Sequence, residues 1–160
     1  GNDHCFTGST IITTQQGGKA MRDVVAGDMV LTSQGWRKVV KKWDNGVQDV
    51  LCMSLKFSNF SVYIEATPTH KFKTDKGWKQ LQSLQEGDRL FLQYDSTGAL
   101  AVQSIENHCA KRERVYDLTI EDCHEYFANG ILVHNCMDAV SYGAVTHLRR
   151  LGILNEWSEV

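Results

Sequence analysis

An internal repeat constrains what this chain folds into more than any other feature of its sequence. When the chain is shifted by 60 positions, segment 14–31 lies on segment 74–91 without a gap. Five of these 18 positions are identical, where unrelated sequence gives about one. The identical residues are Thr14, Gly17, Lys19, Gly27 and Asp28, which meet Thr74, Gly77, Lys79, Gly87 and Asp88. The repeat predicts a duplicated β-subdomain with pseudo-two-fold symmetry, against the alternative of two units that are alike by chance.

The first 133 residues favour β-structure throughout. Short runs rich in β-branched and aromatic residues are separated by turns that contain Gly or Asn, and they lie at 10–13, 29–32, 36–40, 50–55, 61–64 and 89–92. Residues 115–120 alternate between apolar and polar, as a half-buried strand does. Asn129-Gly130 predicts a tight hairpin that joins 124–128 to 131–133. We therefore expect an all-β fold.

The pattern changes after Asn135. Apolar residues recur at helical spacing over 137–151, and Gly152 is placed to end the helix. An all-β body followed by one short amphipathic helix indicates a junction between two different proteins.

Composition excludes several classes of protein. The 160 residues carry 17 Lys and Arg against 19 Asp and Glu, a balance that argues against an electrostatic binder of nucleic acid or membrane surfaces. No apolar run is long enough for a membrane span, and no leader opens the sequence. Five cysteines without C-x-x-C spacing fit neither a disulfide framework nor a zinc ribbon, so we expect a reducing cytoplasmic location.

Four short stretches carry residues capable of chemistry. Each has an ordinary explanation when taken alone, such as a buried thiol, a core histidine or a capped turn. Their order and spacing along the chain make the combination informative. The stretches are Cys5-Phe6-Thr7-Gly8-Ser9-Thr10, Thr67-Pro68-Thr69-His70, Val115-Tyr116-Asp117-Leu118 with Cys123-His124 downstream, and His134-Asn135-Cys136.

In combination these stretches resemble the motifs of an intein, a self-splicing element of the Hint (hedgehog/intein) superfamily. Cys5 opens the N-terminal splicing block, Thr67 and His70 match the T-x-x-H block, and 126–135 matches the C-terminal block. Cys123 and Glu125 depart slightly from the family pattern without removing a catalytic group. The resemblance implies a horseshoe-like all-β Hint fold. Its domains are an N-terminal flank at 1–4, a splicing domain at 5–135 without an inserted homing endonuclease (a mini-intein), and a C-terminal flank at 136–160.

The resemblance implies an autocatalytic, single-turnover reaction at two junctions, the peptide bonds His4–Cys5 and Asn135–Cys136. The Cys5 sulfur reaches the His4 carbonyl through a five-membered ring, and such intramolecular geometry supplies on the order of 7–11 kcal/mol of the barrier. His70 is expected to donate a proton to the leaving nitrogen, with Thr67 hydrogen-bonding nearby. Asp117 is the expected base or orienting group for the thiols of Cys5 and Cys136.

The second half of the expected reaction takes place at the C-terminal junction. Cys136 accepts the acyl group, and Asn135 then cleaves its own peptide bond by cyclising to a succinimide. His134 and His124 are the candidates for polarising that carbonyl and moving protons, because imidazole titrates near neutral pH. The partners implied are the chain's own flanks as substrate, with no cofactor, no nucleic acid and no membrane, in a monomer. Zinc is an expected inhibitor, because thiolates and imidazoles converge at this site.

The flanks offer a hypothesis about the host protein. Removing 5–135 joins Gly1-Asn2-Asp3-His4 to Cys136-Met137-Asp138-Ala139, a string that resembles a nuclease motif of phage-type terminase large subunits. By that resemblance Asp138 is a metal ligand of the host nuclease. The alternative is any helical host segment with an acidic first turn.

Two other readings stay open at this point. A hedgehog-like domain also forms a thioester at its first cysteine but passes it to an external nucleophile, so it has no need of His134-Asn135-Cys136. A metal-binding β-module would use His108/Cys109, Cys123/His124 and His134/Cys136, although neighbours on a strand face opposite sides. A disulfide from Cys5 to Cys123 or Cys136 is a further open question.

Overall fold

A computed structural model of the chain describes residues 4–95 and 98–135. The helix expected over 137–151 lies outside these residues. Within the described part the regular elements are strands and two single-turn 3-10 helices, and no helix there is long and apolar enough to cross a membrane. The elements are β1 (Phe6–Thr7), β2 (Ile11–Thr14), β3 (Gly17–Ala20), η1 (Met21–Asp23), β4 (Met29–Thr32), β5 (Gly35–Lys56), β6 (Ser61–Ala66), β7 (Lys71–Thr74), β8 (Gly77–Gln80), η2 (Leu81–Ser83), β9 (Arg89–Phe91), β10 (Ala99–Ala101), β11 (Ser104–Ile120), β12 (Glu125–Ala128) and β13 (Ile131–His134). The all-β prediction is confirmed.

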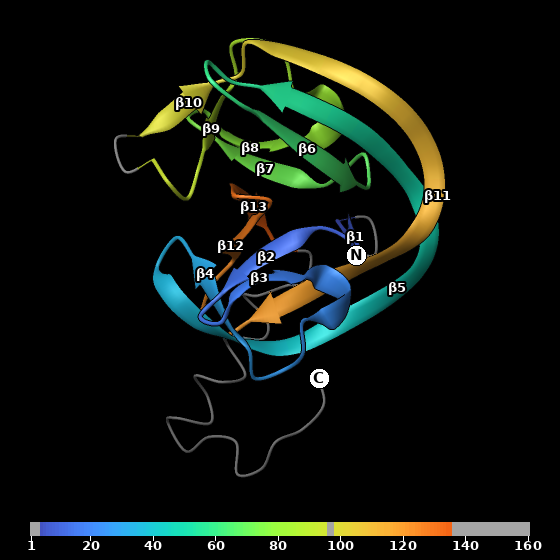
Figure 1. Ribbon diagram of the computed structural model, residues 1–160, viewed down its shortest axis with the longest axis vertical. Helices are drawn as coiled ribbons and strands as arrows, with labels where there is room; N and C mark the ends of the chain where they lie inside the picture. The colour runs from blue at the N-terminus through green and yellow to red at the C-terminus, as the bar shows by residue number, and fades with distance from the viewer. Residues whose placement is uncertain (1–3, 96–97, 136–160) are drawn as a thin grey trace.

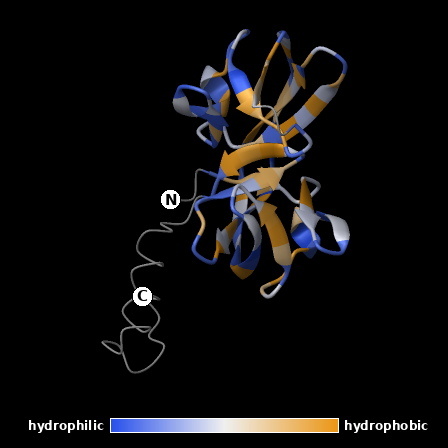
Figure 2. Cartoon of the chain, turned by 90° about the vertical axis from the view of Figure 1, so that its left-hand side faces the viewer, coloured by the Kyte–Doolittle hydropathy of each residue, from blue (hydrophilic) through white to orange (hydrophobic). Residues whose placement is uncertain are grey.

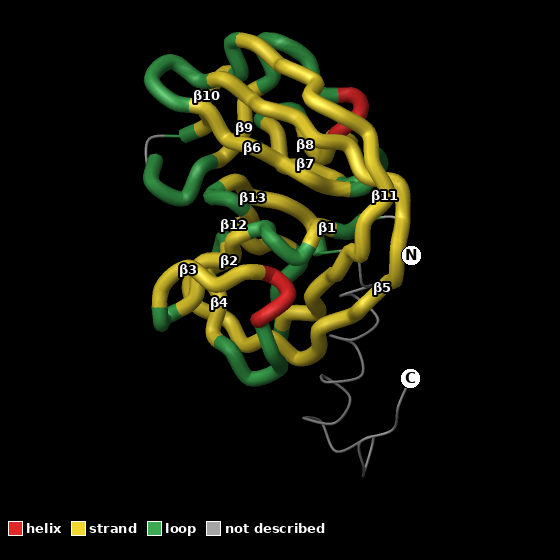
Figure 3. The backbone as a smooth tube through the Cα atoms, turned by 45° about the vertical axis from the view of Figure 1, so that its right-hand side comes forward, coloured by secondary structure: helices red, strands yellow, loops and turns green. Residues whose placement is uncertain are grey.

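The predicted repeat is a repeat of structure. The units β2–β3–η1–β4 and β7–β8–η2–β9 have the same element order, and Figure 3 shows their two short helices in opposite halves of the molecule. Lys19 pairs with Asp28 at 2.8 Å, and Lys79 pairs with Asp88 at 2.8 Å. The threonine that opens each turn bonds the carbonyl three residues later in both copies. The alternative of a chance likeness is therefore rejected.

The structural repeat begins earlier than its sequence signature. The N–H of Thr10 donates to Thr7 O at 3.1 Å, and the N–H of His70 donates to Thr67 O at 3.0 Å. The carbonyls of Thr10 and His70 in turn accept the N–H that opens each 3-10 helix, at 2.7 and 2.8 Å. The T-x-x-H turn thus has a partner turn sixty residues upstream, in which Thr10 occupies the place of the histidine.

Two long strands join the halves of the molecule. Residues 36–40 and 50–55, expected as separate strands, are parts of one 22-residue strand, β5, which pairs with the 17-residue β11. Periodicity missed the intervening stretch because most of its side chains are polar and only partly buried, and cross-strand ion pairs such as Arg112–Asp49 replace apolar contacts there. Figure 1 shows both strands curving together along one side of the molecule, as a horseshoe-like fold requires.

The short strand β1 closes part of the sheet. Phe6 pairs with Tyr116 of β11 on one side and with Ala66 of β6 on the other. Because β5 also pairs with both β11 and β6, these four strands form a closed ring of hydrogen-bonded neighbours. Cys5 immediately precedes β1, so the ring determines where the first junction lies.

The predicted hairpin is present and links the two repeats. Asn129 and Gly130 both have positive φ, at 47° and 81°, as a two-residue hairpin turn of this kind needs. β12 pairs with β2 of the first repeat, and β13 pairs with β7 of the second. The strands β3, β7, β8 and β10 were not predicted, because lysines or glycines interrupt the first three and β10 is only the three residues Ala99–Ala101.

The core divides into two clusters. The main cluster runs through both repeats and includes Phe6, Phe72 and Tyr126, all fully buried. A small second cluster holds Cys5 with Val50, Cys52 and Val115. Figure 2 shows the most hydrophobic strand segments gathered in the middle of the molecule, where the halves meet. The first junction therefore emerges from an apolar interior.

We expect Asp28→Ala and Asp88→Ala to lower the free energy of unfolding by similar amounts, about 1–2 kcal/mol each. Each carboxylate accepts a lysine and a loop N–H in its own repeat, through Val25 N in the first and Gln85 N in the second. Burial opposes ionisation of Asp28, but these hydrogen bonds outweigh it and hold its pKa below the ordinary value. Urea unfolding monitored by circular dichroism measures the effect.

Asp49→Ala serves as the matched control, because its ion pair with Arg112 lies on the exposed surface. It should change stability little. A large loss of unfolding free energy for only one of the two Asp variants would show that the two ion pairs do not stabilise the fold equally.

Candidate active site

Cys5 lies buried at the entrance to β1, held through its backbone by Thr67. The Cys5 N–H donates to the Thr67 hydroxyl at 2.9 Å, and the Thr67 N–H donates to the Cys5 carbonyl at 3.0 Å. Both side chains are almost completely shielded from solvent. Because the Cys5 N–H belongs to the first junction, Thr67 contacts the nitrogen of the bond that the sequence predicts to break.

His70 lies at the end of the same turn, wholly buried against the Phe6 ring at 4.1 Å between ring centroids. Burial, with smaller contributions from the nearby His4 and His134, lowers the pKa of His70 from 6.5 to about 3, although backbone groups of His134 and Cys5 oppose the shift. His70 is therefore a neutral imidazole at physiological pH. Within the described part of the chain, neither ring nitrogen has a hydrogen bond of normal geometry.

The two junctions meet at this imidazole. The His4 ring lies 6.1 Å from the His70 ring and 6.4 Å from the His134 ring. His4 and His134 are the residues next to Cys5 and Asn135, so two positions 130 residues apart in the chain share one site. The resemblance requires this proximity, and the strand pairing of β13 with β7 produces it.

Asn135 is clamped by the backbone of the Cys123–His124 turn. Its main-chain N–H donates to the His124 carbonyl at 2.9 Å, and its side-chain Nδ2 donates to the Cys123 carbonyl at 3.1 Å. The side chain is fully buried, and its Oδ1 has no hydrogen-bond partner among residues 4–95 and 98–135. The nucleophilic nitrogen of the expected cyclisation is thus held in one orientation by a carbonyl that sequence reasoning did not anticipate.

His134 and His124 differ in their surroundings. His134 is half-buried, with its ring edge-on to Trp78 at 4.9 Å. Burial lowers the pKa of His134, and the positive charges of His4, Lys71 and His124 lower it further. His124 is exposed, and its ring lies parallel to that of His134 at 6.5 Å. Trp78 was not predicted, because its strand β8 was not.

Asp117 is fully buried on β11. Phe6 pairs with Tyr116, and continuing that antiparallel register by one residue places Cys5 opposite Asp117. The carboxyl therefore belongs to the same corner of the molecule as the first junction.

One further residue contacts the Cys5 sulfur. Asn45 Nδ2 donates to Cys5 Sγ at 3.0 Å from a distortion in the middle of β5. Sequence analysis missed this residue. The signal was the dipeptide Asn45-Gly46, a turn pattern inside what proves to be a continuous strand.

Some predicted residues and sites fall outside this geometry. Cys136 and Asp138 lie outside the described residues. The four described cysteines form no disulfide, and Cys5 and Cys123 belong to different core clusters. Within residues 4–95 and 98–135 no three His, Cys, Asp or Glu side chains come together to hold a metal ion, so the metal-binding module finds no support there. Inhibition by zinc, which involves Cys136, stays a prediction.

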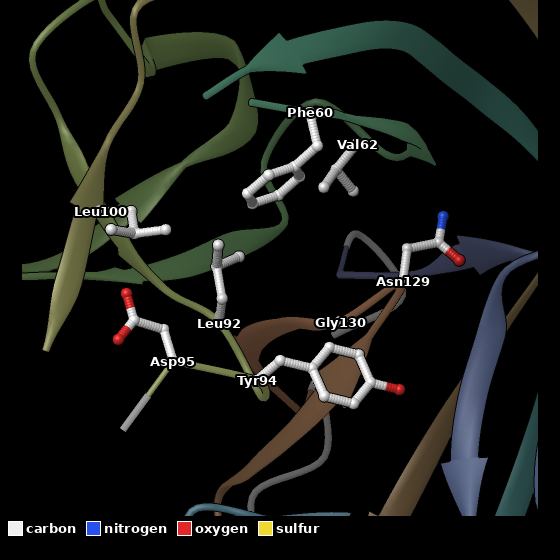
Figure 4. A pocket seen from close by; sticks show the side chains of 8 residues that line it. All are labelled: Phe60, Val62, Leu92, Tyr94, Asp95, Leu100, Asn129 and Gly130. Carbon is white, nitrogen blue, oxygen red and sulfur yellow. The ribbon is translucent and has the colours of Figure 1, made fainter. Parts of the chain in front are cut away.

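An apolar cavity of about 520 Å³ lies away from these residues, where Phe60, Leu92, Tyr94 and Leu100 surround it beside the turn at Gly130 (Figure 4). None of the described catalytic candidates lines it. The buried groups around Cys5 and Asn135 are consistent with a reaction within the chain, since such a reaction needs no cavity for a separate substrate.

Comparison with known proteins finds one matching family and several solved structures with a similar fold. Residues 11–136 match the profile of the pretoxin HINT domain family. A DnaB intein from Synechocystis sp. PCC 6803 superposes with a TM-score of 0.69 at 26% identity, covering 83% of this chain and 99% of that one. The DnaX mini intein from Spirulina platensis gives 0.65 at 28% identity, covering 82% and 100%. A bacterial intein-like domain from Clostridium thermocellum gives 0.65 at 28%, covering 82% and 99%. No curated protein matches the chain.

His70 should make stability depend on pH. Its pKa is lower in the folded chain than in the unfolded one, so its contribution is complete above pH 6.5 and is lost as the pH falls toward 3. Between about pH 7 and pH 5 the chain should lose about 2 kcal/mol more than a His70→Gln variant. Urea unfolding at each pH measures this, with Cys5 and Asn135 both replaced by Ala so that neither junction reacts. Parallel pH curves for the two chains would contradict a buried, neutral His70.

Proposed function

Since the chain belongs to the pretoxin HINT domain family and has the fold of inteins, we propose that residues 5–135 excise themselves by autocatalytic protein splicing. The flanks, 1–4 and 136–160, are the substrate and become joined. One observation carries this proposal. His4 and His134 stand next to Cys5 and Asn135, and their ring centroids lie 6.4 Å apart, with the His70 ring 6.1 Å from that of His4.

The first step is an acyl shift from nitrogen to sulfur. Cys5 Sγ attacks the carbonyl carbon of His4, a C–S bond forms, and the C–N bond of the His4–Cys5 peptide breaks. The thiol proton ends on the α-nitrogen of Cys5. Thr67 supports this step because it holds both the N–H and the carbonyl of Cys5, which keeps the sulfur and the scissile bond in one arrangement.

His70 carries the proton in this proposal. Its low pKa makes it neutral before the reaction, so it first accepts a proton and then delivers it to the leaving nitrogen. The apolar wall of Phe6 and Phe72 excludes water from its ring. A neutral imidazole that ends the step neutral leaves no charge buried.

The second step passes the acyl group to the other junction. The sulfur of Cys136 attacks the same carbonyl carbon, and Cys5 leaves as a thiol, so the N-terminal flank becomes a thioester on Cys136. Asp117 is the proposed base for the attacking thiol, because a carboxylate beside the first junction is able to accept its proton.

The third step releases the domain. Asn135 Nδ2 attacks its own carbonyl carbon, the bond to Cys136 breaks, and a succinimide forms while the proton moves to the departing α-nitrogen. The Cys123 carbonyl orients Nδ2, and His134 and His124 are the proposed proton carriers. The α-amino group of Cys136 then attacks the thioester, and a normal peptide bond joins His4 to Cys136.

A second candidate function is self-cleavage without ligation, as in the hedgehog-like alternative. The family match is the observation that favours this second candidate, because the match is to pretoxin HINT domains and begins at residue 11, after Cys5. The two functions share the first step and differ in the fate of the flanks. A terminase host and a metal-binding Asp138 remain predictions about the protein that surrounds the domain.

Splicing predicts a specific set of products by intact-mass measurement. The chain should give a free fragment of residues 5–135 that ends in a succinimide, together with 1–4 joined to 136–160. Separate flanks without the joined product would support self-cleavage, and an unchanged mass under reducing conditions would contradict both functions.

Two variants separate the junctions. Cys5→Ala should abolish thioester formation and ligation, because no sulfur remains to attack, while leaving cleavage at Asn135 measurable. Asn135→Ala should abolish C-terminal cleavage while an added thiol still releases the N-terminal flank. Mass spectrometry follows both products over time. Full splicing in either variant would overturn these assignments.

A further inference from the structure

Asn45 projects toward the reacting sulfur because β5 is irregular at that point. The register between β5 and β11 shifts beside Arg114 and Tyr116, so Asn45 and Gly46 lie opposite the single residue Val115. Gly46 has φ of 71°, a conformation that favours glycine. A bulge of this kind bends a strand and re-aims a side chain, and bulges are frequent beside active sites.

The bulge is held from both ends. The Asp44 carboxylate accepts the N–H of Gly46 at 3.0 Å and pairs with Arg114 at 2.9 Å. On the other side, Gln48 Nε2 donates to the Asn45 carbonyl at 3.1 Å. These contacts fix the backbone of Asn45 while leaving its side-chain amide to face Cys5, where Nδ2 lies 3.0 Å from Sγ.

The surroundings of the Cys5 sulfur indicate what the hydrogen bond from Asn45 does. Cys5 is fully buried in a cluster with Val50, Cys52 and Val115, and apolar burial disfavours the thiolate that must form. A hydrogen bond to the charged form of a group favours that form. The amide of Asn45 supplies such a bond without adding a buried charge.

We propose that Asn45 is a catalytic residue of the first splicing step, whose side-chain N–H stabilises the developing thiolate of Cys5. The inference rests on the proposed function and deepens its first step. As Sγ loses its proton and attacks the His4 carbonyl carbon, the Asn45 amide donates to the sulfur. The proton passes to the α-nitrogen as the peptide bond breaks, and Asn45 is chemically unchanged.

The test compares Asn45→Ala and Asn45→Asp in a chain that carries Asn135→Ala, so that only the first junction reacts. Dithiothreitol intercepts the thioester, and mass spectrometry follows release of residues 1–4 over a range of pH. Asn45→Ala should react on the order of tenfold more slowly near neutral pH, with its pH profile displaced upward by about one unit. Asn45→Asp should be slower still, because a carboxylate of the same shape repels the thiolate.

Val47→Ala is the matched control, since Val47 is an exposed residue beside the bulge whose side chain points to solvent. It should release the flank at the parent rate. Cleavage at Asn135 in a Cys5→Ala chain provides the second readout, and adding Asn45→Ala there should leave that rate unchanged if the fold is intact.

Three results would overturn the proposal. A rate for Asn45→Asp that matches or exceeds the parent rate would mean that the amide oxygen faces the sulfur or that the residue only shapes the bulge. If the pH profile of flank release is not shifted in Asn45→Ala, the role of Asn45 is structural. Equal slowing by Val47→Ala would assign the effect to the bulge. If the Asn135→Ala parent itself releases no flank, the proposed function fails at its first step, and the inference fails with it.

Discussion

The double pairing of Phe6 is the contact on which the site depends. A two-residue strand that bonds β11 on one side and β6 on the other leaves little freedom for the residue before it, so Cys5 is buried at a defined place beside Thr67. The same ring of four strands brings the bulge of β5 to the sulfur. Without β1 between its neighbours, no strand pairing would hold Cys5 beside Thr67.

Duplication explains how a symmetric scaffold supports an asymmetric reaction. The turns at Thr7–Thr10 and Thr67–His70 make equivalent backbone hydrogen bonds, yet one ends in threonine and the other in histidine. Strand pairing by β12 and β13 then brings Asn135 to the histidine-bearing half. The proposed chemistry is thus confined to one of two similar corners, because that corner alone receives the residues next to both proposed junctions and the imidazole.

Burial determines the protonation state of the site. Three imidazoles, from His4, His70 and His134, lie close together, and burial makes each additional positive charge costly at the fully buried His70. His70, the most buried, is held neutral. A neutral centre is able to receive and return a proton within one step, whereas a permanently charged one would have to be stabilised by a counter-ion.

The sequence alone determined the repeat, the hairpin at Asn129-Gly130 and the residues of the splicing motifs, because turn chemistry and local periodicity are properties of neighbours in the chain. It did not reveal that 36–40 and 50–55 are one strand, since the pairing that joins them is with residues more than 60 positions away. Only the tertiary structure decided that His4 and His134 meet, that Asn45 faces Cys5, and that the Cys123 carbonyl holds Asn135. Those contacts come from the register between distant strands and from a bulge, and the local Asn45-Gly46 pattern indicates a turn without showing which residue it faces.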